Sequence, residues 1–237
     1  MHSPAIHCRG SVKKITFAFP GIESRAMHLF TDVMFIEQPP TFYRLLFPHS
    51  LWRLPASPKC IYLTFDDGPI PEVTPWVLDV LDSYGVKATF FMVGDNVRKH
   101  PEVFRMVVER GHRVGNHTFN HIQGLRYWTR NYLRNVEQAA SLIPSTLFRP
   151  PHGHMRLPQT LFLSRKYRIV MWDVVTRDYN RALSPEDVLA NVLRYTRNGS
   201  IIVFHDSLKA EKNLRWALPK AIEWLMAEGY NFELIPD

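Results

Sequence analysis

The sequence predicts an α/β fold in a single domain, a distorted or incomplete (β/α)7 barrel. From residue 60 onward, seven short apolar segments alternate with amphipathic stretches of helical spacing. Hairpin signals between these segments are almost absent, which favours parallel strands joined by helical crossovers. No glycine-rich phosphate fingerprint follows the first segment, and 237 residues suit one barrel better than an open doubly wound sheet.

The predicted strands are short runs rich in aliphatic and aromatic residues. They cover residues 61–65, 88–93, 113–116, 146–148, 168–174, 200–204 and 231–235. Between the first two, apolar residues recur at helical spacing from Val73 to Tyr84, with Pro75 in the first turn, where proline is tolerated. The next helix opens at Pro101 and closes at Gly111.

Three further helices follow from the same signals. An apolar stripe runs from Trp128 to Ile143, and Ser184 is a good N-cap for the helix that follows it. The last helix contains Leu218 and Leu225 and ends at Gly229.

The sequence pattern divides the chain into three segments. Residues 1–37 show no clear period and are interpreted as an irregular extension or a start-site artefact, because Met27 and Met34 are in frame. Residues 38–59 are rich in proline and aromatic residues and are expected to be an irregular segment packed on the barrel. A membrane-surface anchor is less favoured there, since no helical moment supports it. Residues 60–237 form the predicted catalytic domain.

Composition excludes several classes of protein. The apolar fraction of 46% and charged fraction of 22% are typical of soluble globular domains. Net charge is +7, but no basic run exceeds two residues, so no nucleic-acid partner is predicted. Cys8 and Cys60 do not suggest a disulfide framework. No segment reaches the roughly 18 apolar residues of a membrane span, and no signal peptide is evident, so a cytoplasmic location is the default, with cell-envelope association left open.

Polar residues follow most of the predicted strands. Asp66 and Asp67 follow the first strand, and the others are His117 and His121 after the third, Arg149 after the fourth, Asp178 after the fifth and His205 after the sixth. The carboxyl ends of parallel barrel strands share one rim, where barrel enzymes place their chemistry. We therefore expect these residues to form one site.

Three of these residues suit a metal ion. His117 and His121 are four residues apart and can reach one cation if the segment is helical or tightly turned. With Asp67 they supply the three protein ligands of a catalytic zinc site, although cobalt, nickel or iron would fit the same donors. The alternative for the histidine pair alone is an exposed helix face. Asp66 beside Asp67 could then act as a base towards a metal-activated water.

Two other residues suit proton transfer and orientation. His205 ends a strand on the same rim, which favours a general acid over a core histidine. Arg149 precedes two prolines that stiffen the backbone, and we expect it to pair with Asp66. A purely structural salt bridge is the alternative for Arg149.

From about residue 60 to 235 the chain resembles the polysaccharide deacetylase family, carbohydrate esterase family four. The resemblance depends on five motifs in order: Thr64-Phe65-Asp66-Asp67-Gly68, His117-Thr118-Phe119-Asn120-His121, Arg149-Pro150-Pro151-His152-Gly153, in part Trp172 to Tyr179, and Val203-Phe204-His205. It implies a distorted barrel, one divalent metal and hydrolysis of N-acetyl, sometimes O-acetyl, groups on an acetylated glycan.

The resemblance also implies a role for each matched residue. Asp66 would be the base, His205 the acid, Arg149 the partner of Asp66, and Asp178 the carboxylate that tunes His205. Asp67, His117 and His121 would be the metal ligands. His152 replaces a usual tyrosine whose backbone N–H contacts the oxyanion, while Val175, Tyr179 and Val203 replace residues that affect substrate fit.

Three other functions are alternatives to this interpretation. A haloacid-dehalogenase phosphatase needs aspartates two residues apart, and Phe65 stands two before Asp67, so that class is discarded. A non-catalytic sugar-binding or scaffold protein on the same fold remains an alternative, as does a hydrolase of small amides or acetyl esters. The polymer (peptidoglycan, chitin-like or exopolysaccharide) and the oligomeric state stay open.

Overall fold

The computed structural model describes residues 37–54 and 58–237. Residues 1–36, which include Cys8, lie outside the described ranges, so the expectations for them stay predictions. The strands are β1 Ser50–Leu51, β2 Cys60–Asp66, β3 Thr89–Met92, β4 Arg113–Asn116, β5 Leu147–Phe148, β6 Arg168–Val170, β7 Val174–Val175, β8 Ile201–His205 and β9 Asn231–Phe232. The α-helices are α2 Thr41–Leu45, α3 Thr74–Ser83, α4 Gly94–Lys99, α5 Pro101–Glu109, α6 Thr129–Ala140, α7 Leu157–Leu163, α8 Pro185–Tyr195 and α9 Glu211–Ala227, and two 3-10 turns are η1 Gly124–Arg126 and η2 Pro151–Gly153.

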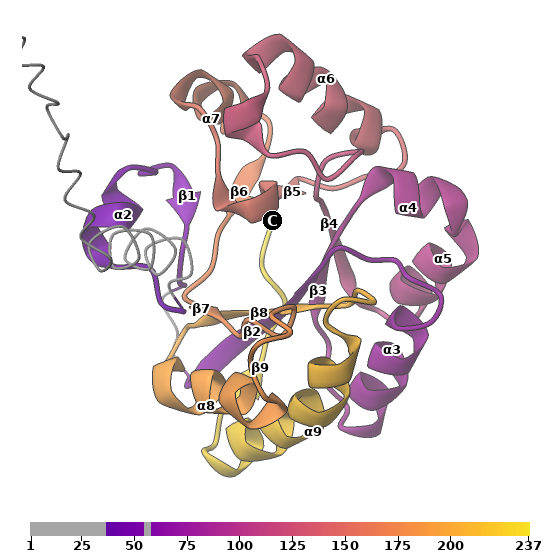
Figure 1. The fold of residues 1–237 in the computed structure, drawn as a ribbon, viewed down its shortest axis with the longest axis vertical. Coiled ribbons are helices and arrows are strands. Elements are labelled where there is room, and N and C mark those ends of the chain that lie inside the picture. Colours follow the sequence, from indigo (N-terminus) through magenta and orange to yellow (C-terminus); the bar gives the residue numbers. More distant parts are fainter. Residues whose placement is uncertain (1–36, 55–57) are drawn as a thin grey trace, which may run out of the picture. The chain divides into compact units, whose positions relative to one another are not determined.

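The sheet is parallel and curls into an incomplete barrel. Its strand order is β1-β6-β5-β4-β3-β2-β8-β7, with β9 added beside β2. Helices surround the strands on the outside (Figure 1). Within the described residues β1 and β7 end the order without pairing with each other, so the barrel is open at that point. The predicted fold class, a distorted or incomplete barrel, is confirmed.

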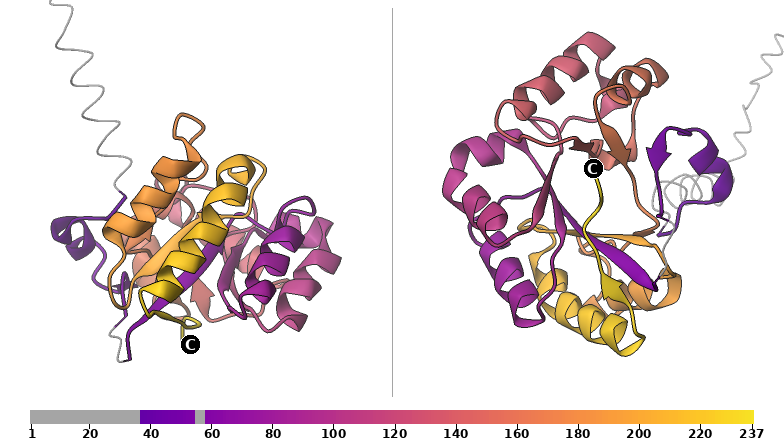
Figure 2. Two further views of the ribbon diagram at one scale, coloured as in Figure 1. Left: turned by 90° about the horizontal axis from the view of Figure 1, so that it is seen from below. Right: turned by 180° about the vertical axis from the view of Figure 1, so that it is seen from behind.

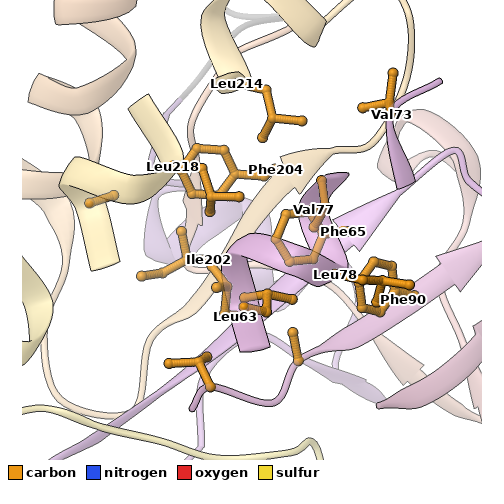
Figure 3. Close-up of a cluster of buried hydrophobic side chains, with 14 of the residues drawn as sticks. Leu63, Phe65, Val73, Val77, Leu78, Phe90, Ile202, Phe204, Leu214 and Leu218 are labelled. Carbon is orange, nitrogen blue, oxygen red and sulfur yellow. The ribbon is translucent and has the colours of Figure 1, made fainter. Parts of the chain in front are cut away.

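Alternation along β2 separates the core from the barrel interior. Ile61, Leu63 and Phe65 belong to the main apolar cluster between the strands and the helices α3 and α9 (Figure 3). Phe65 stacks on Phe90 of β3 with ring centroids 4.9 Å apart. Burial of each such side chain contributes about 1.5–3 kcal/mol, so this face anchors the strand.

The intervening residues of β2 belong to a second set of contacts. Cys60 and Tyr62 pack in another buried cluster that includes Ile235, near the C-terminus. Viewed from behind, the C-terminal segment crosses the centre of the ring of strands (Figure 2). Because strand side chains alternate, Thr64 and Asp66 follow Cys60 and Tyr62 on this face, away from the helices. The second aspartate, Asp67, lies just beyond the strand end.

The predicted strand 168–174 is wrong as a single element. It forms two short strands, β6 paired with β5 and β1, and β7 paired with β8. The chain changes partner between them: Met171 N–H donates to Leu51 O (2.7 Å), whereas Asp173 N–H donates to Ile201 O (2.9 Å). This change of partner carries the chain across the open side of the barrel.

The segment before the first predicted strand is more regular than expected. It contains the helix α2 and the strand β1, which pairs with β6 through Ser50 and Ile169. Arg44 of α2 forms an ion pair with the buried Asp173 (2.6 Å). The expectation of an irregular segment is therefore corrected, because long-range partners order residues that have no periodic pattern of their own.

The helices predicted from sequence correspond to α3, α5, α6, α8 and α9. Ser184 caps α8 by accepting from the Asp187 N–H, and Asp187 Oδ2 accepts from the Ser184 N–H in return. The short helices α4 and α7 were not predicted. Among the described helices, none has the length and apolar character that crossing a bilayer requires.

Candidate active site

The three candidate metal ligands come from two loops at the carboxyl ends of β2 and β4. Asp67 follows β2 with φ of 83°, and His121 has φ of 52° in the turn after β4. Such left-handed backbone costs on the order of 1–3 kcal/mol at a non-glycine residue and persists only where surrounding contacts impose it. His117 is 2% exposed. The histidine pair therefore lies in a tight turn, and the exposed helix face considered as its alternative is wrong.

The ligand atoms of these residues converge. His121 Nε2 lies 3.1 Å from Asp67 Oδ1, and His117 Nε2 lies 3.8 Å from the same oxygen. All three ligand atoms lie within 4.8 Å of one another. A tetrahedral ion with bonds near 2.0–2.1 Å needs ligand atoms about 3.3 Å apart. The donor set of two imidazole nitrogens and one carboxylate oxygen therefore fits a divalent cation.

His117 is prepared as a neutral ligand. Its Nδ1 lies 2.8 Å from the carbonyl oxygen of Arg149, and a carbonyl can only accept, so Nδ1 holds the proton and Nε2 is bare. Burial lowers the pKa of His117 to about 4, outweighing the carboxylates of Asp66 and Asp67. At neutral pH the imidazole is therefore uncharged, as a metal ligand must be.

Asp67 is held ionised. Burial opposes its charge, but the hydrogen bond from His121 and electrostatic interactions with the surrounding histidines, led by His205, outweigh burial and keep the pKa of Asp67 well below its usual range. An ionised carboxylate is the state that binds a cation.

The side chain of Asp66 lies on the interior face of β2, where it meets Arg149. Arg149 Nη1 donates to Asp66 Oδ1 (2.6 Å) and to Thr64 Oγ1 (2.9 Å). The guanidinium is fully buried; its Nε donates to Val170 O and its Nη2 to Met171 O. Each nitrogen of the Arg149 guanidinium thus has a partner, and the fixed guanidinium holds the Asp66 carboxylate beside the metal ligands.

His205 and Asp178 form a second pair on the same rim. Asp178 Oδ1 lies 2.8 Å from His205 Nδ1, and Asp178 Oδ2 accepts the His205 backbone N–H (2.7 Å). Burial alone would lower the pKa of His205, but the charge and hydrogen bond of Asp178, with Asp67 and Asp66, raise it to about 9. The imidazole is therefore protonated at neutral pH and can donate a proton.

The three residues predicted to contact substrate lie in different settings. His152 has φ of 59° and its ring lies 4.9 Å from that of His121. The Tyr179 ring packs edge-on against His205 at 4.7 Å. Val203 is 1% exposed in β8, in register with Thr64. His152 and Tyr179 thus adjoin the site, whereas Val203 lies within the sheet.

Two residues that hold the site were missed by sequence reasoning. Asp206 is buried and accepts the Gly68 N–H (3.0 Å) and the Thr74 hydroxyl (2.6 Å), which fixes the loop after Asp67. Burial and the charge of Asp67 raise the pKa of Asp206 to about 8. Asn135 of α6 accepts the backbone N–H groups of Phe119 (2.9 Å) and Asn120 (3.1 Å). Only the position of Asp206 next to His205 gave a signal in the sequence.

A cavity of about 340 Å³ opens beside the metal ligands. Its lining includes Asp67, His121, Asn96, Asn120 and Ser207. The site therefore combines three metal donors, a carboxylate fixed by an arginine, an imidazolium and an adjoining space for a ligand, which is the equipment of a hydrolase that activates water.

Comparison with known proteins places the chain among carbohydrate-active enzymes. The sequence model described as polysaccharide deacetylase matches residues 53–171. A peptidoglycan-N-acetylglucosamine deacetylase of Bacillus cereus is 31% identical over 196 residues, covering 78% of this chain and 91% of the relative. A chitooligosaccharide deacetylase of Bradyrhizobium is 38% identical over 159 residues, covering 64% of this chain and 72% of the relative.

Solved structures show the same architecture. The crystal structure of a peptidoglycan N-acetylglucosamine deacetylase has a TM-score of 0.75 and 30% identity, covering 84% of this chain and 95% of that one. A family-four pseudoenzyme of Bacillus anthracis has a TM-score of 0.68 and 26% identity, covering 78% of this chain and 66% of that one. The fold thus occurs in both active and inactive proteins.

Proposed function

Because the chain belongs to the polysaccharide deacetylase family, we propose that it hydrolyses N-acetyl groups on an amino-sugar polymer, with Asp66 as base and His205 as acid. One observation carries the proposal: three metal donors, Asp67, His117 and His121, converge within 4.8 Å. Asp66 stands next to Asp67 in the chain, and its carboxylate is paired with Arg149. The bond cleaved is the amide of the acetamido group, and the products are acetate and a free amine.

Asp67, His117 and His121 would hold one divalent cation, for which we propose zinc. Two nitrogens and one oxygen form a catalytic zinc set, and cobalt, nickel or iron would bind the same donors. When bound, such an ion polarises a carbonyl oxygen and lowers the pKa of water from 15.7 towards about 7. The proton transfers of the reaction are carried out by the side chains of Asp66 and His205.

Asp66 receives the proton of the attacking water. Its Oδ1 is 2.6 Å from Arg149 Nη1, so the carboxylate is held in one orientation by a charge-assisted hydrogen bond. The second oxygen is then available to the water. A positioned general base of this kind contributes about 10²–10⁴-fold to the rate.

His205 returns a proton to the departing nitrogen. Asp178 fixes the proton on Nδ1 and orients the ring, which leaves the Nε2 proton for the amine. As charge develops on the acetyl oxygen, we propose that the backbone N–H of His152 donates to it, a task that histidine performs as well as tyrosine. The side chains of His152 and Tyr179 would contact the sugar, and Val203 would lie behind the acetyl methyl group.

The experiment is acetate release by purified protein across acetylated glucosamine oligomers, peptidoglycan, exopolysaccharide and simple acetyl esters, together with elemental analysis. We expect release from amino-sugar glycans and about one zinc per chain. Glycan binding without acetate release would favour the non-catalytic alternative, for which the pseudoenzyme of the same fold is a precedent. Faster turnover of simple esters than of any glycan would favour a small-molecule hydrolase.

A further inference from the structure

Helix α6 presents a polar face next to the loop that holds the metal ligands. Asn131, Arg134, Asn135 and Gln138 follow the pattern i, i+3, i+4, i+7 and therefore share one side of the helix. Together they line a cavity of about 480 Å³, the other lining residues being Asn120, Ile122 and Tyr127. The helix lies at the edge of the ring of helices, beside α7 (Figure 1).

This cavity adjoins the site. Asn120 lines both it and the 340 Å³ cavity beside Asp67 and His121. Asn135 Nδ2 donates to Asn120 Oδ1 (2.8 Å), and Asn135 Oδ1 accepts the Asn120 N–H (3.1 Å). The boundary between the two cavities is therefore fixed by hydrogen bonds, and a ligand in one lies next to a ligand in the other.

The remaining polar side chains of the cavity have unused hydrogen-bonding capacity. Within the described part of the chain, the side chains of Asn131, Arg134 and Gln138 make no hydrogen bond or ion pair. The nearest acidic residue along the helix, Glu137, pairs with Lys166 (3.4 Å). Amides suit the hydroxyl and acetamido groups of a sugar. The guanidinium of Arg134 has no carboxylate partner among the residues that the structure describes, so it suits a carboxylate of the ligand. Its planar fork matches both carboxylate oxygens.

We propose that this cavity is a subsite for a carboxylate-bearing sugar of the same glycan, bound by Arg134 while a neighbouring N-acetyl sugar occupies the site. The inference rests on the proposed function, since it assumes a glycan in the catalytic cavity. It narrows the substrate class, because a wholly neutral polymer would leave Arg134 without a partner. The carboxylate is either a substituent of the sugar itself or part of a peptide attached to it.

The test is kcat/KM for acetate release by the metal-loaded full chain on three glycans. These are neutral N-acetylglucosamine oligomers, peptidoglycan strands with their peptides removed, which retain a lactyl carboxylate, and strands with their peptides attached. We expect the wild type to prefer the acidic glycans by roughly fivefold, mainly through KM, as an exposed charge pair allows. In Arg134→Gln the acidic glycans should be processed no better than the neutral ones.

Two further variants sharpen the test. Arg134→Lys keeps the charge but not the fork and should retain part of the preference. Arg105→Gln removes an exposed arginine of α5 that lines none of these cavities and should keep the wild-type preference. Preference confined to the peptide-free strands would assign the carboxylate to the sugar, and preference confined to peptide-bearing strands would assign it to the peptide.

The proposal would be overturned if the wild type shows no preference, or if Arg134→Gln lowers the rate on all three glycans equally. Failure of the proposed function is distinguishable from failure of the subsite. If no glycan releases acetate, calorimetric binding of the same glycans still measures the subsite: tighter binding of the acidic strands that is lost in Arg134→Gln supports it, and equal binding of all three overturns it.

Discussion

The carboxylate of Asp178 binds His205 twice, through the ring Nδ1 at 2.8 Å and through the backbone N–H at 2.7 Å. The two contacts use different oxygens, so the carboxylate is held beside the ring. The charge of Asp178 and its bond to Nδ1 raise the pKa of His205 to about 9 although burial opposes its charge.

The first prediction concerns the alkaline limb of the pH profile. His205 must be protonated to act as an acid, so activity should fall as pH rises through about 9. Asp178→Asn removes the charge that raises the pKa, and the alkaline limb should move by at least one pH unit towards neutrality, with kcat reduced roughly 10–100-fold at pH 8. The control is Asp79→Asn, which removes an exposed carboxylate paired with Arg110. An unmoved limb in Asp178→Asn would exclude His205 as the acid.

The same shift makes a prediction for stability. The folded pKa of His205 lies above the usual 6.5, so the protonated imidazole stabilises the fold. That contribution is complete below pH 6.5 and is lost as pH rises through about 9. The free energy of unfolding, measured in urea across this window, should therefore decline less steeply in His205→Gln than in the wild type. Identical slopes would contradict the raised pKa.

A second catalytic prediction separates the base from the metal ligands. Asp66→Asn should lower kcat about 10²–10⁴-fold while leaving metal content near that of the wild type, because Asp66 bonds Arg149 and not the donor cluster. Asp67→Asn should lose both activity and metal. The measurements are acetate release and metal per chain by elemental analysis. Turnover near the wild-type rate in Asp66→Asn would remove this residue from the role of base.

Metal removal should affect stability as well as rate. An ion that binds only the folded chain stabilises it by about 2.7 kcal/mol when present at 100 times its Kd. For a chain of this length that corresponds to a Tm roughly 5–10 °C higher with metal than with chelator. Readdition of zinc should restore both Tm and acetate release. His117→Ala and His121→Ala should each abolish the difference in Tm between metal and chelator.

Much of the fold could be predicted because its signals are local. The continuous apolar run of β2 and the helical stripes of α3 and α6 depend on neighbouring residues only. The division of 168–174 into β6 and β7 could not be predicted, because it depends on Leu51 and Ile201, which lie far away in the chain. The helix α7 was not predicted because apolar residues such as Leu157 and Phe162 are exposed, so its sequence has no clear apolar face.

The residues of the site likewise divide into those that the sequence predicts and those that it does not. Residues with chemical roles lie in motifs, so Asp67, His117 and His121 could be grouped from strand ends before their convergence was seen. Residues that only hold those motifs in place have no chemical signature. Asn135 lies 14 residues beyond His121 on the face of a helix, and nothing in its neighbours marks it as a partner of the metal-ligand loop.

Asn135 therefore gives the sharpest test of how the metal loop is held. Its Oδ1 accepts two consecutive backbone N–H groups, from Phe119 and Asn120, immediately before His121, whose φ is 52°. Without that acceptor the left-handed turn loses its restraint and the His121 ring its fixed position. Asn135→Ala should weaken zinc binding by about 10–100-fold, the usual effect of removing a group that supports a metal ligand.

The matched variant for this prediction is Asn135→Asp, which keeps the acceptor oxygen for the two backbone N–H groups but replaces the donor to Asn120 Oδ1 by a second, charged oxygen. It should bind zinc much more tightly than Asn135→Ala, and competition with a chromophoric chelator measures both affinities. Since neither change touches a ligand atom, a loss in Asn135→Ala relative to the wild type, where no charge is added, reports on the turn. Equal affinities in the wild type and Asn135→Ala would mean that Asp67 and His117 hold the ion without a fixed His121 loop.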